Sequence, residues 1–392
     1  MKIRRFRPDA ALVALGLSLA APAAAQDDVA ARIQAVESAH VPMTGSAKGG
    51  PPETLVQTMR RLRVPGMSIA VIRDFKVDWV KGYGIADAAS GAAVDADTRF
   101  QAASISKPVT AMAAVRLAQE KRIDLDRDVN LLLRGRKLVR PAGAGWPPVT
   151  PRSLFSHTAG AADGFGFPGY APDAALPTFE QEIEGQAPSV LGPVRFDQPP
   201  YRSSRYSGGG LLIMQKALAD ATGEPFERLM QQLVLRPLGM THSSFARPQG
   251  DAPGYARAHD ATGKRMGAPW HVYPEMAAAG LWTTSGDLAR FVIELARGGA
   301  GEQGAVLTPD FARQMLAPVG VGDFAVGPRI IRIGDQWYFW HGGSNWGFEA
   351  RIIGHVRKGY GLVIMTNAQA SGADLIEEVQ ARIFSAYHWD GK

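Results

Sequence analysis

The sequence contains no cysteine among its 392 residues. It therefore has neither a disulfide bond nor the cysteine to which a lipoprotein anchor is attached. A chain without such covalent supports depends on its hydrophobic core for stability. Hydrophobic residues make up 46% of the sequence, which is ordinary for a globular protein and ample for a buried core.

Metal-binding and α/β-hydrolase patterns are also missing. The eight histidines are scattered, without a His-Glu-x-x-His or similar paired spacing, so the sequence implies no metal and no cofactor. No serine lies in a Gly-x-Ser-x-Gly elbow, which argues against an α/β-hydrolase. The formal net charge is +6, about half of it in the N-terminal segment, and no long basic run suggests a nucleic-acid partner.

The first 25 residues have the pattern of an export signal. Four basic residues precede an apolar stretch over 10–21, and small alanines follow. This stretch is shorter than the about 20 residues that cross a bilayer. We expect cleavage after Ala25, a periplasmic or secreted protein, and no membrane span in the mature chain. Residues 26–52 are expected to form a helix, over 27–41, and then a linker rich in glycine and proline.

Strand patterns lie near both ends of the remaining chain. Runs at 67–73 and 77–83 are separated by a short turn typical of a hairpin. Further runs lie at 324–333, 336–340, 348–355 and 361–366, and a final amphipathic helix is expected over 373–386. Between about 121 and 275 the pattern is mostly helices and loops. This order predicts an α+β fold over 53–392, in which helices and a helix-rich insertion flank one antiparallel sheet built from both ends of the chain.

The most informative motif is Ser104-Ile105-Ser106-Lys107. A helix turns about 100° per residue, so positions 104 and 107 lie roughly 60° apart on one face, whereas Ser106 points elsewhere. Ser104 is therefore the candidate nucleophile and Lys107 its base. A motif this short also arises by chance, and the alternative is an N-capping serine followed by a surface lysine.

The residues around the motif place it at a helix N-terminus. Pro108 is tolerated only where a backbone N–H would be unpaired, and apolar residues follow at helical spacing from 109 to 117. Ser104 is therefore expected in the first turn. There the unpaired N–H groups and the positive end of the helix dipole favour a developing negative charge. We expect this helix to lie where the sheet meets the insertion, a usual place for a cleft.

Two distant segments support the catalytic interpretation. Tyr206-Ser207-Gly208-Gly209-Gly210 is a glycine-rich turn before a helical run over 211–218, and His341-Gly342-Gly343-Ser344 follows the strand-like run over 336–340. With Ser104-x-x-Lys107 they form an ordered trio that resembles the S-x-x-K, Y-x-N and K-T-G or H-x-G signatures of the serine β-lactamase and penicillin-binding superfamily. The resemblance is to its class C β-lactamase-related branch, which also holds D-Ala-D-Ala carboxypeptidases, D-aminopeptidases and esterases. It covers roughly 64–384 and includes the family-like stretches 155–160, 236–240, 278–284 and 363–367.

The resemblance implies a β-lactamase/transpeptidase-like fold and a serine acyl-enzyme. A serine hydroxyl is a poor nucleophile until a neighbour takes its proton, and a lysine does so only when burial or positive charge lowers its pKa, so we expect Lys107 to be buried. By resemblance, Tyr206 shares this proton and passes it to the leaving group or to water. The family pattern also places an oxyanion hole between the backbone N–H groups of Ser104 and Ser344.

The third segment brings a glycine pair and a departure from the family. Gly342 and Gly343 let a substrate approach a strand edge closely. His341 stands where many relatives carry a lysine that attracts a substrate carboxylate. Because a histidine with a pKa near 6.5 is mostly neutral at neutral pH, carboxylate recognition should be weaker or pH-dependent.

Gly208 is a second departure, because it takes the place of the Asn in Y-x-N. In many relatives that side chain holds the substrate amide and orients the lysine.

The expected partner is a small-molecule or peptidoglycan-derived substrate, and its chemistry stays open between an ester, an amide and a β-lactam. The alternative function is a non-catalytic or slowly acylated protein that binds penicillins or cell-wall peptides. A pure binder has no need of Ser104, Lys107 and Tyr206 together, which weighs against this alternative. His157 lies in the family-like stretch 155–160 and is interpreted as a structural residue.

Overall fold

The computed structural model describes residues 23–39, 53–135, 137–138, 145–163, 166–249 and 251–389. Most of the expected signal peptide and the whole expected linker lie outside these residues. The helix expected over 27–41 is α1, Ala23–Ser38. Within the described ranges, no helix combines the length and the apolar character that a membrane span requires.

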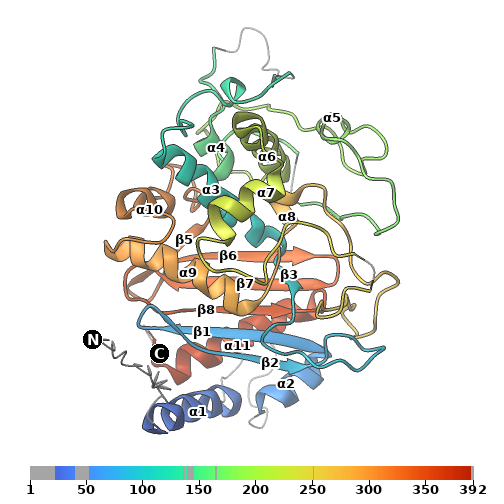
Figure 1. The fold of residues 1–392 in the computed structure, drawn as a ribbon, viewed down its shortest axis with the longest axis vertical. Coiled ribbons are helices and arrows are strands. Elements are labelled where there is room, and N and C mark those ends of the chain that lie inside the picture. Colours follow the sequence, from blue (N-terminus) through green and yellow to red (C-terminus); the bar gives the residue numbers. More distant parts are fainter. Residues whose placement is uncertain are drawn as a thin grey trace, which may run out of the picture.

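The described part of the chain forms one six-stranded sheet in the order β2-β1-β8-β7-β6-β5, with every neighbouring pair antiparallel. Its strands are β1 (Gly66–Arg73), β2 (Lys76–Gly84), β5 (Arg329–Ile333), β6 (Gln336–Asn345), β7 (Phe348–His355) and β8 (Gly361–Thr366). The hairpin and the sheet built from both ends of the chain are confirmed (Figure 1).

Helices cover both faces of this sheet. One face carries α1, α2 (Leu55–Leu62) and α11 (Ser371–Ala386), and the other carries α9 (Ser285–Ala300) backed by α10 (Pro309–Leu316). Side chains alternate across a strand, so Ile69 and Val71 of β1 join the core beside α11, whereas Ala70 and Ile72 join the core on the α9 side. The double cover explains why seven of the eight residues of β1 are buried, although antiparallel strands often keep one polar face.

The segment over 100–283, which includes the insertion expected over about 121–275, connects the hairpin to the later part of the chain. It contains α3 (Ser106–Gln119), α4 (Pro151–Phe155), α5 (Phe179–Glu184), α6 (Gly208–Thr222), α7 (Phe226–Met230), the π-helical turn η3 (Gln231–Leu235), α8 (Met276–Ala279) and the 3-10 turns η1 (Ala103–Ile105) and η2 (Val129–Leu131). A two-stranded sheet of β3 (Phe100–Gln101) and β4 (Trp282–Thr283) lies where it begins and ends. Figure 1 shows α3, α4, α6 and α7 gathered at the end of the molecule opposite α1 and α2.

Two strand predictions were wrong in extent. The strand expected over 324–333 begins only at Arg329, because Gly327 has a φ of +108° and Pro328 has no N–H to give to a ladder. The strand expected over 336–340 continues to Asn345, so the whole His341 segment belongs to β6.

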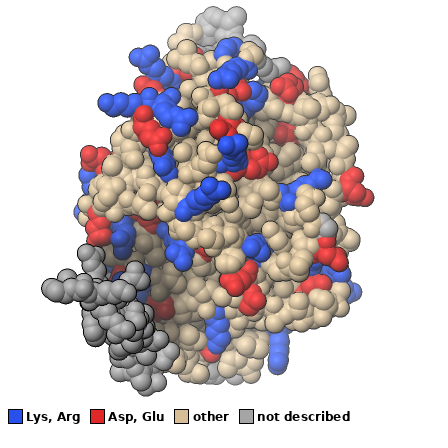
Figure 2. Space-filling view, viewed as in Figure 1, with Lys and Arg blue, Asp and Glu red and all other residues tan. Residues whose placement is uncertain are grey.

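Charges of both signs are mixed on the visible surface. Figure 2 shows Lys and Arg side chains interspersed with Asp and Glu over this face of the molecule. Ion pairs on the described surface include Arg313 with Asp310 and Arg195 with Glu184. Pairs of this kind contribute about 0 to 1 kcal/mol each to stability, so the core and not the surface charge holds the fold.

Candidate active site

Ser104 and Lys107 are in direct contact. Lys107 Nζ donates to Ser104 Oγ at 2.9 Å and to the carbonyl of Ala278 at 2.9 Å. The lysine side chain is 2% exposed, so its predicted burial is confirmed, and Ser104 is partly exposed. The second serine of the motif does point elsewhere, because Ser106 Oγ donates to the Ala103 carbonyl and accepts from the Leu281 N–H.

Ser104 lies just before the helix and not in its first turn, where it was predicted. It belongs to the 3-10 turn η1, and α3 begins at Ser106, which makes Pro108 the third helical residue. The residue before it, Ala103, has a φ of +49°, a left-handed conformation that costs a non-glycine residue about 1 kcal/mol or more. The chain therefore turns sharply just before the serine and then enters the helix that carries Lys107.

The short helix α8 fixes the base from the other side. Its Ala278 carbonyl accepts from Lys107, and the Leu281 carbonyl two residues beyond the helix accepts from the N–H of Ala102. Trp282 then pairs with Gln101 in the two-stranded sheet. The family-like stretch 278–284 is thus the support that holds η1 and the lysine together.

Tyr206 faces the ammonium group of the lysine. Lys107 Nζ lies 4.9 Å from the centroid of the Tyr206 ring, a cation–π distance. The glycines after it do not form the predicted turn, because Gly208–Gly210 are the first turn of α6. Ser207 is the N-cap of this helix and accepts from the Gly210 N–H at 2.8 Å. Tyr206 is therefore held just outside a capped helix N-terminus.

His157 supports Tyr206 from behind. Its Nδ1 accepts from the backbone N–H of Ser207 at 3.1 Å, and its ring packs against the Tyr206 ring with centroids 4.4 Å apart. Burial, and then the Lys107 charge, hold the pKa of His157 well below its ordinary value, so the ring is neutral. This is the structural role that the sequence suggested.

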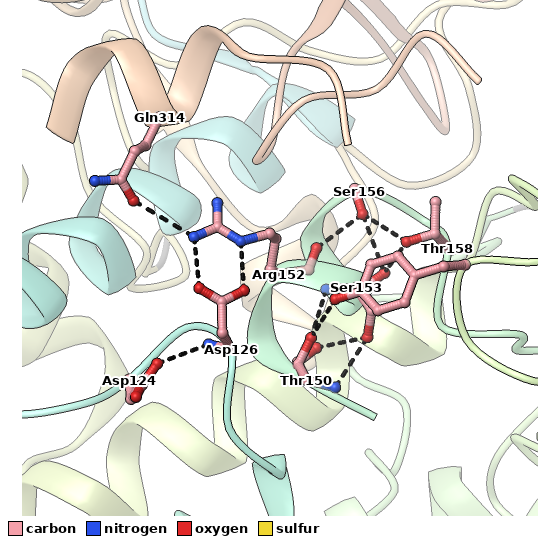
Figure 3. A network of polar contacts seen from close by, with 9 residues as sticks. Asp124, Asp126, Thr150, Arg152, Ser153, Ser156, Thr158 and Gln314 are labelled. Atoms are coloured by element: carbon pink, nitrogen blue, oxygen red, sulfur yellow. Dashed lines mark hydrogen bonds and ion pairs between the residues drawn. The ribbon is translucent and has the colours of Figure 1, made fainter. Parts of the chain in front are cut away.

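A polar network anchors the segment that carries His157 (Figure 3). Thr150 and Ser153 form a capping box at the N-terminus of α4, and Ser156 Oγ lies 2.8 Å from Thr158 Oγ1. On the outer side, Arg152 binds Asp126 with two hydrogen bonds of 2.6 and 2.9 Å. These contacts make the loop around His157 a rigid support.

The end of β6 forms the opposite wall of the site. Strand β5 pairs with β6 only as far as Trp340, so the backbone from His341 to Asn345 lines the cleft on that side. A Cβ at Gly343 would lie 2.2 Å from the Ala102 carbonyl oxygen, so only glycine lets this strand pass so close to η1. The segment of β6 that carries Ser344 therefore lies beside the turn that carries Ser104.

Burial decides the charge of His341. The side chain is 3% exposed, and burial, with the nearby Lys107 charge, lowers its pKa to about 3. Its Nδ1–H donates to the Gly342 carbonyl at 2.6 Å, so the proton of the neutral ring sits on Nδ1. Of the two predicted outcomes, weaker carboxylate recognition is favoured, because a ring with this pKa does not titrate near neutral pH.

These side chains line a cleft of about 1020 Å³ between the sheet and the insertion. The seven predicted site residues all line this cleft: Ser104, Lys107, Tyr206, His341, Gly342, Gly343 and Ser344. Sequence reasoning missed other members of the wall. They include Phe167 and Phe324 from loops, and Glu349 from β7, whose carboxylate accepts from Ser344 Oγ at 2.8 Å. No local spacing connects these residues to the motifs.

A helix-flanked antiparallel sheet with a Ser-x-x-Lys pair, an opposing tyrosine and a glycine-bearing strand edge defines the serine β-lactamase and penicillin-binding class of proteins. The sequence profile described as Beta-lactamase matches residues 53–385. The chain belongs to the beta-lactamase family.

Individual relatives are distant. The chain is 28% identical over 252 residues to the Unguisins hydrolase ungD of Aspergillus violaceofuscus, covering 60% of this chain and 43% of that protein. It is 26% identical over 242 residues to a Beta-lactamase of Pseudomonas fluorescens, covering 61% of this chain and 62% of the relative. The chain thus spans less than two thirds of the length of these curated relatives.

Solved structures show the same fold. The structure of EstCE1, described as a hydrolase with promiscuous acyltransferase activity, superposes with a TM-score of 0.69. The sequences are 19% identical, and the match covers 92% of this chain and all of EstCE1. At this identity the likeness speaks for the fold alone.

Proposed function

We propose that this protein is an exported serine hydrolase that forms an acyl-enzyme on Ser104 with an ester, amide or β-lactam substrate. The observation that carries the proposal is the 2.9 Å contact between a buried Lys107 Nζ and a partly exposed Ser104 Oγ inside the cleft. A surface lysine beside an N-capping serine, the alternative weighed from the sequence, is excluded by this burial.

In the proposed acylation step, Ser104 Oγ attacks the carbonyl carbon of the substrate while its proton moves to Lys107 Nζ. The Ala278 carbonyl keeps Nζ in place during this transfer, because it accepts a second hydrogen bond from the same atom. The oxyanion that forms accepts from the N–H groups of Ser104 and Ser344. Removing one such donor typically costs about 3 to 4 kcal/mol in the barrier.

The leaving group needs a proton to depart, and Tyr206 is the proposed donor. The centroid of its ring lies 4.9 Å from Lys107 Nζ, and we expect the proton taken from the serine to pass through the lysine and the phenol. Water then attacks the ester carbonyl of Ser104 and gives one proton to the same pair. The pair returns this proton to Ser104 Oγ as the ester C–O bond breaks, which releases the acid and restores the enzyme. Both steps use only groups of this chain.

The names of the relatives agree with hydrolysis at a carbonyl. They include a hydrolase of unguisins and a β-lactamase. These names support a hydrolase, and they leave the choice of substrate to the walls of the cleft.

The decisive experiment exposes the purified protein to a 4-nitrophenyl ester, a chromogenic cephalosporin and a D-Ala-D-Ala peptide. Turnover and intact mass are followed for wild type, Ser104→Ala and the matched control Ser106→Ala. We expect turnover and an acyl adduct in wild type, and neither in Ser104→Ala. Activity that survives in Ser104→Ala refutes the nucleophile assignment. A stable adduct without turnover supports the alternative, a slowly acylated binding protein.

Export is tested separately. The basic residues and apolar stretch of the first 25 residues support it. We expect the protein recovered outside the cytoplasm to begin at Gln26, as measured by intact mass. A full-length chain confined to the cytoplasm contradicts this part of the proposal.

A further inference from the structure

An aromatic ring fills the space beside Gly208. A Cβ added at this glycine would lie 2.4 Å from Cε2 of Phe167. The ring thus occupies the volume into which any side chain at position 208 would extend, an asparagine included. In this cleft an apolar surface replaces an amide that could bind a polar substrate group.

Described residues on either side of Phe167, Asp163 and Pro168, are held by hydrogen bonds. Asp163 accepts from Ser207 Oγ at 2.6 Å and from the Gly209 N–H at 2.8 Å, which ties the loop to the N-terminus of α6. After the ring, the Pro168 carbonyl accepts from Nδ1 of His271 at 2.9 Å. These contacts hold Asp163 and Pro168 in place near the ring, and a pre-organised ring can select among substrates.

Position 341 supplies no positive charge. His341 is 3% exposed and neutral, with its pKa lowered to about 3 by burial. Its Nδ1–H is already used by the Gly342 carbonyl. A neutral, buried imidazole gives a substrate carboxylate neither an ion pair nor a free donor.

The other cations of the described cleft wall have partners. Arg329 pairs with Asp323 at 2.8 Å, and Arg351 pairs with Glu377 at 2.6 Å. Lys107 is held by the serine and the Ala278 carbonyl. A carboxylate entering this cleft would therefore lose its hydration without meeting an unpaired cation, which is unfavourable.

The remaining wall is largely apolar. Its apolar side chains are Phe167, Pro168, Leu191, Phe324, Trp340 and Ile376. Building on the proposed acyl-enzyme, we propose that the cleft selects uncharged esters that have an apolar acyl group and a leaving group without a carboxylate. Phe167 and His341 are the residues that set this choice.

The first test measures the effect of one charge on the leaving group. 3-Carbamoylphenyl hexanoate and 3-carboxyphenyl hexanoate have nearly the same shape, and only the second carries a negative charge. We expect wild type to prefer the carbamoyl ester in kcat/KM by about tenfold, the equivalent of about 1.4 kcal/mol. His341→Lys should reduce this ratio by about the same factor, whereas Leu131→Lys, at a 68% exposed position outside the cleft, should leave it unchanged.

The second test measures the acyl pocket. Phe167→Ala should lower the ratio of kcat/KM for 4-nitrophenyl hexanoate over 4-nitrophenyl acetate by about tenfold, because a half-buried ring no longer covers the longer chain. Leu131→Ala removes an apolar side chain of the outer surface and should keep the wild-type ratio.

The outcomes separate this inference from the proposed function. If the esters, the cephalosporin and the D-Ala-D-Ala peptide are all left intact and Ser104 gains no adduct, the proposed function fails, and the inference fails with it. Turnover of the cephalosporin or the peptide but of no ester overturns the inference alone. If wild type hydrolyses these esters but treats the two leaving groups equally or prefers the carboxylate, only the inference is overturned. If Phe167→Ala keeps the wild-type ratio of kcat/KM for 4-nitrophenyl hexanoate over 4-nitrophenyl acetate, the proposed role of the Phe167 ring is wrong. Should His341→Lys fail to fold, two measurements still test the inference: the comparison of the carbamoyl and carboxy esters in wild type, and the chain-length ratio in Phe167→Ala.

Discussion

His157 accepts, on Nδ1, a hydrogen bond of 3.1 Å from the backbone N–H of Ser207. This one contact ties the loop after α4 to the cap of α6. Because the same imidazole packs on the Tyr206 ring, the position of the candidate proton relay depends on a residue that has no part in the chemistry. His157 is a positioning residue.

The first prediction concerns this contact. His157→Phe keeps an aromatic ring but leaves the buried Ser207 N–H without its acceptor, which should lower the free energy of unfolding by about 1 to 3 kcal/mol. A displaced Tyr206 should also reduce kcat for an ester about tenfold with little change in KM. Urea unfolding and steady-state kinetics measure the two effects, with His242→Phe, outside the cleft, as control. An unaltered kcat would show that Tyr206 does not depend on His157.

The two serines of the motif should behave in opposite ways. Ser106→Ala removes the hydroxyl that joins the Ala103 carbonyl to the Leu281 N–H, and we expect a loss of about 1 to 3 kcal/mol in the free energy of unfolding. The acyl adduct should still form. Ser104→Ala should keep its stability within about 0.5 kcal/mol and lose the adduct. Mass spectrometry after an ester pulse, together with denaturant melts, distinguishes the pair, and an adduct missing from Ser106→Ala alone would reverse their assigned roles.

A third prediction compares neighbouring glycines of β6. The added Cβ of Gly343→Ala would lie 2.2 Å from the Ala102 carbonyl oxygen, whereas the Cβ of Gly342→Ala would have its nearest neighbour at 3.5 Å, an ordinary contact. We expect Gly343→Ala to lose about 1 to 3 kcal/mol of stability, because the strand and η1 must separate, and Gly342→Ala to stay close to wild type. Thermal melts provide the comparison, and equal melting temperatures would mean that the two backbones are not in firm contact.

A fourth prediction concerns pH. Burial raises the pKa of the Glu349 carboxyl to about 7, above its ordinary value of 4.5. The folded state then holds a proton that the unfolded state releases, so stability should fall as the pH rises from about 4.5 to 7 and level off above this range. The total loss from this group is about 3 kcal/mol.

Glu349→Gln should remove this dependence, because the amide does not titrate. Unfolding free energies at pH 5 and pH 8 should differ less in this variant than in wild type, and the exposed substitution Glu302→Gln should leave the wild-type difference intact. A variant that keeps the wild-type slope would show that other groups cause it.

The extent to which the fold followed from the sequence varied with the type of signal. Strands β7 and β8 match their predicted ranges. β8 is a short apolar run, whereas β7 alternates apolar and charged residues over 348–352, and turn residues precede each strand. Residues 324–328 were predicted to belong to a strand and do not, because Gly327 and Pro328 interrupt the backbone hydrogen bonds of a strand. Phe324 lines the cleft instead. Glycines 208–210 were predicted as a turn and instead form the start of α6. Without side chains, Gly208 and Gly209 leave room for Phe167 and Val194, and no local sequence pattern predicts these neighbours.

The sequence by itself determined the local geometry of this protein. The three-residue spacing of Ser104 and Lys107 brings them together on one turn of chain, and the order of apolar runs determines which segments can form the sheet. Tertiary structure alone decided what surrounds that pair: the Ala278 carbonyl on the lysine, the Phe167 ring in place of an amide, and a His341 kept neutral. The physical reason is that spacing encodes only which face a side chain occupies. Contacts between distant segments, and the desolvation that shifts a pKa, exist only once the sheet and the insertion have closed over one another.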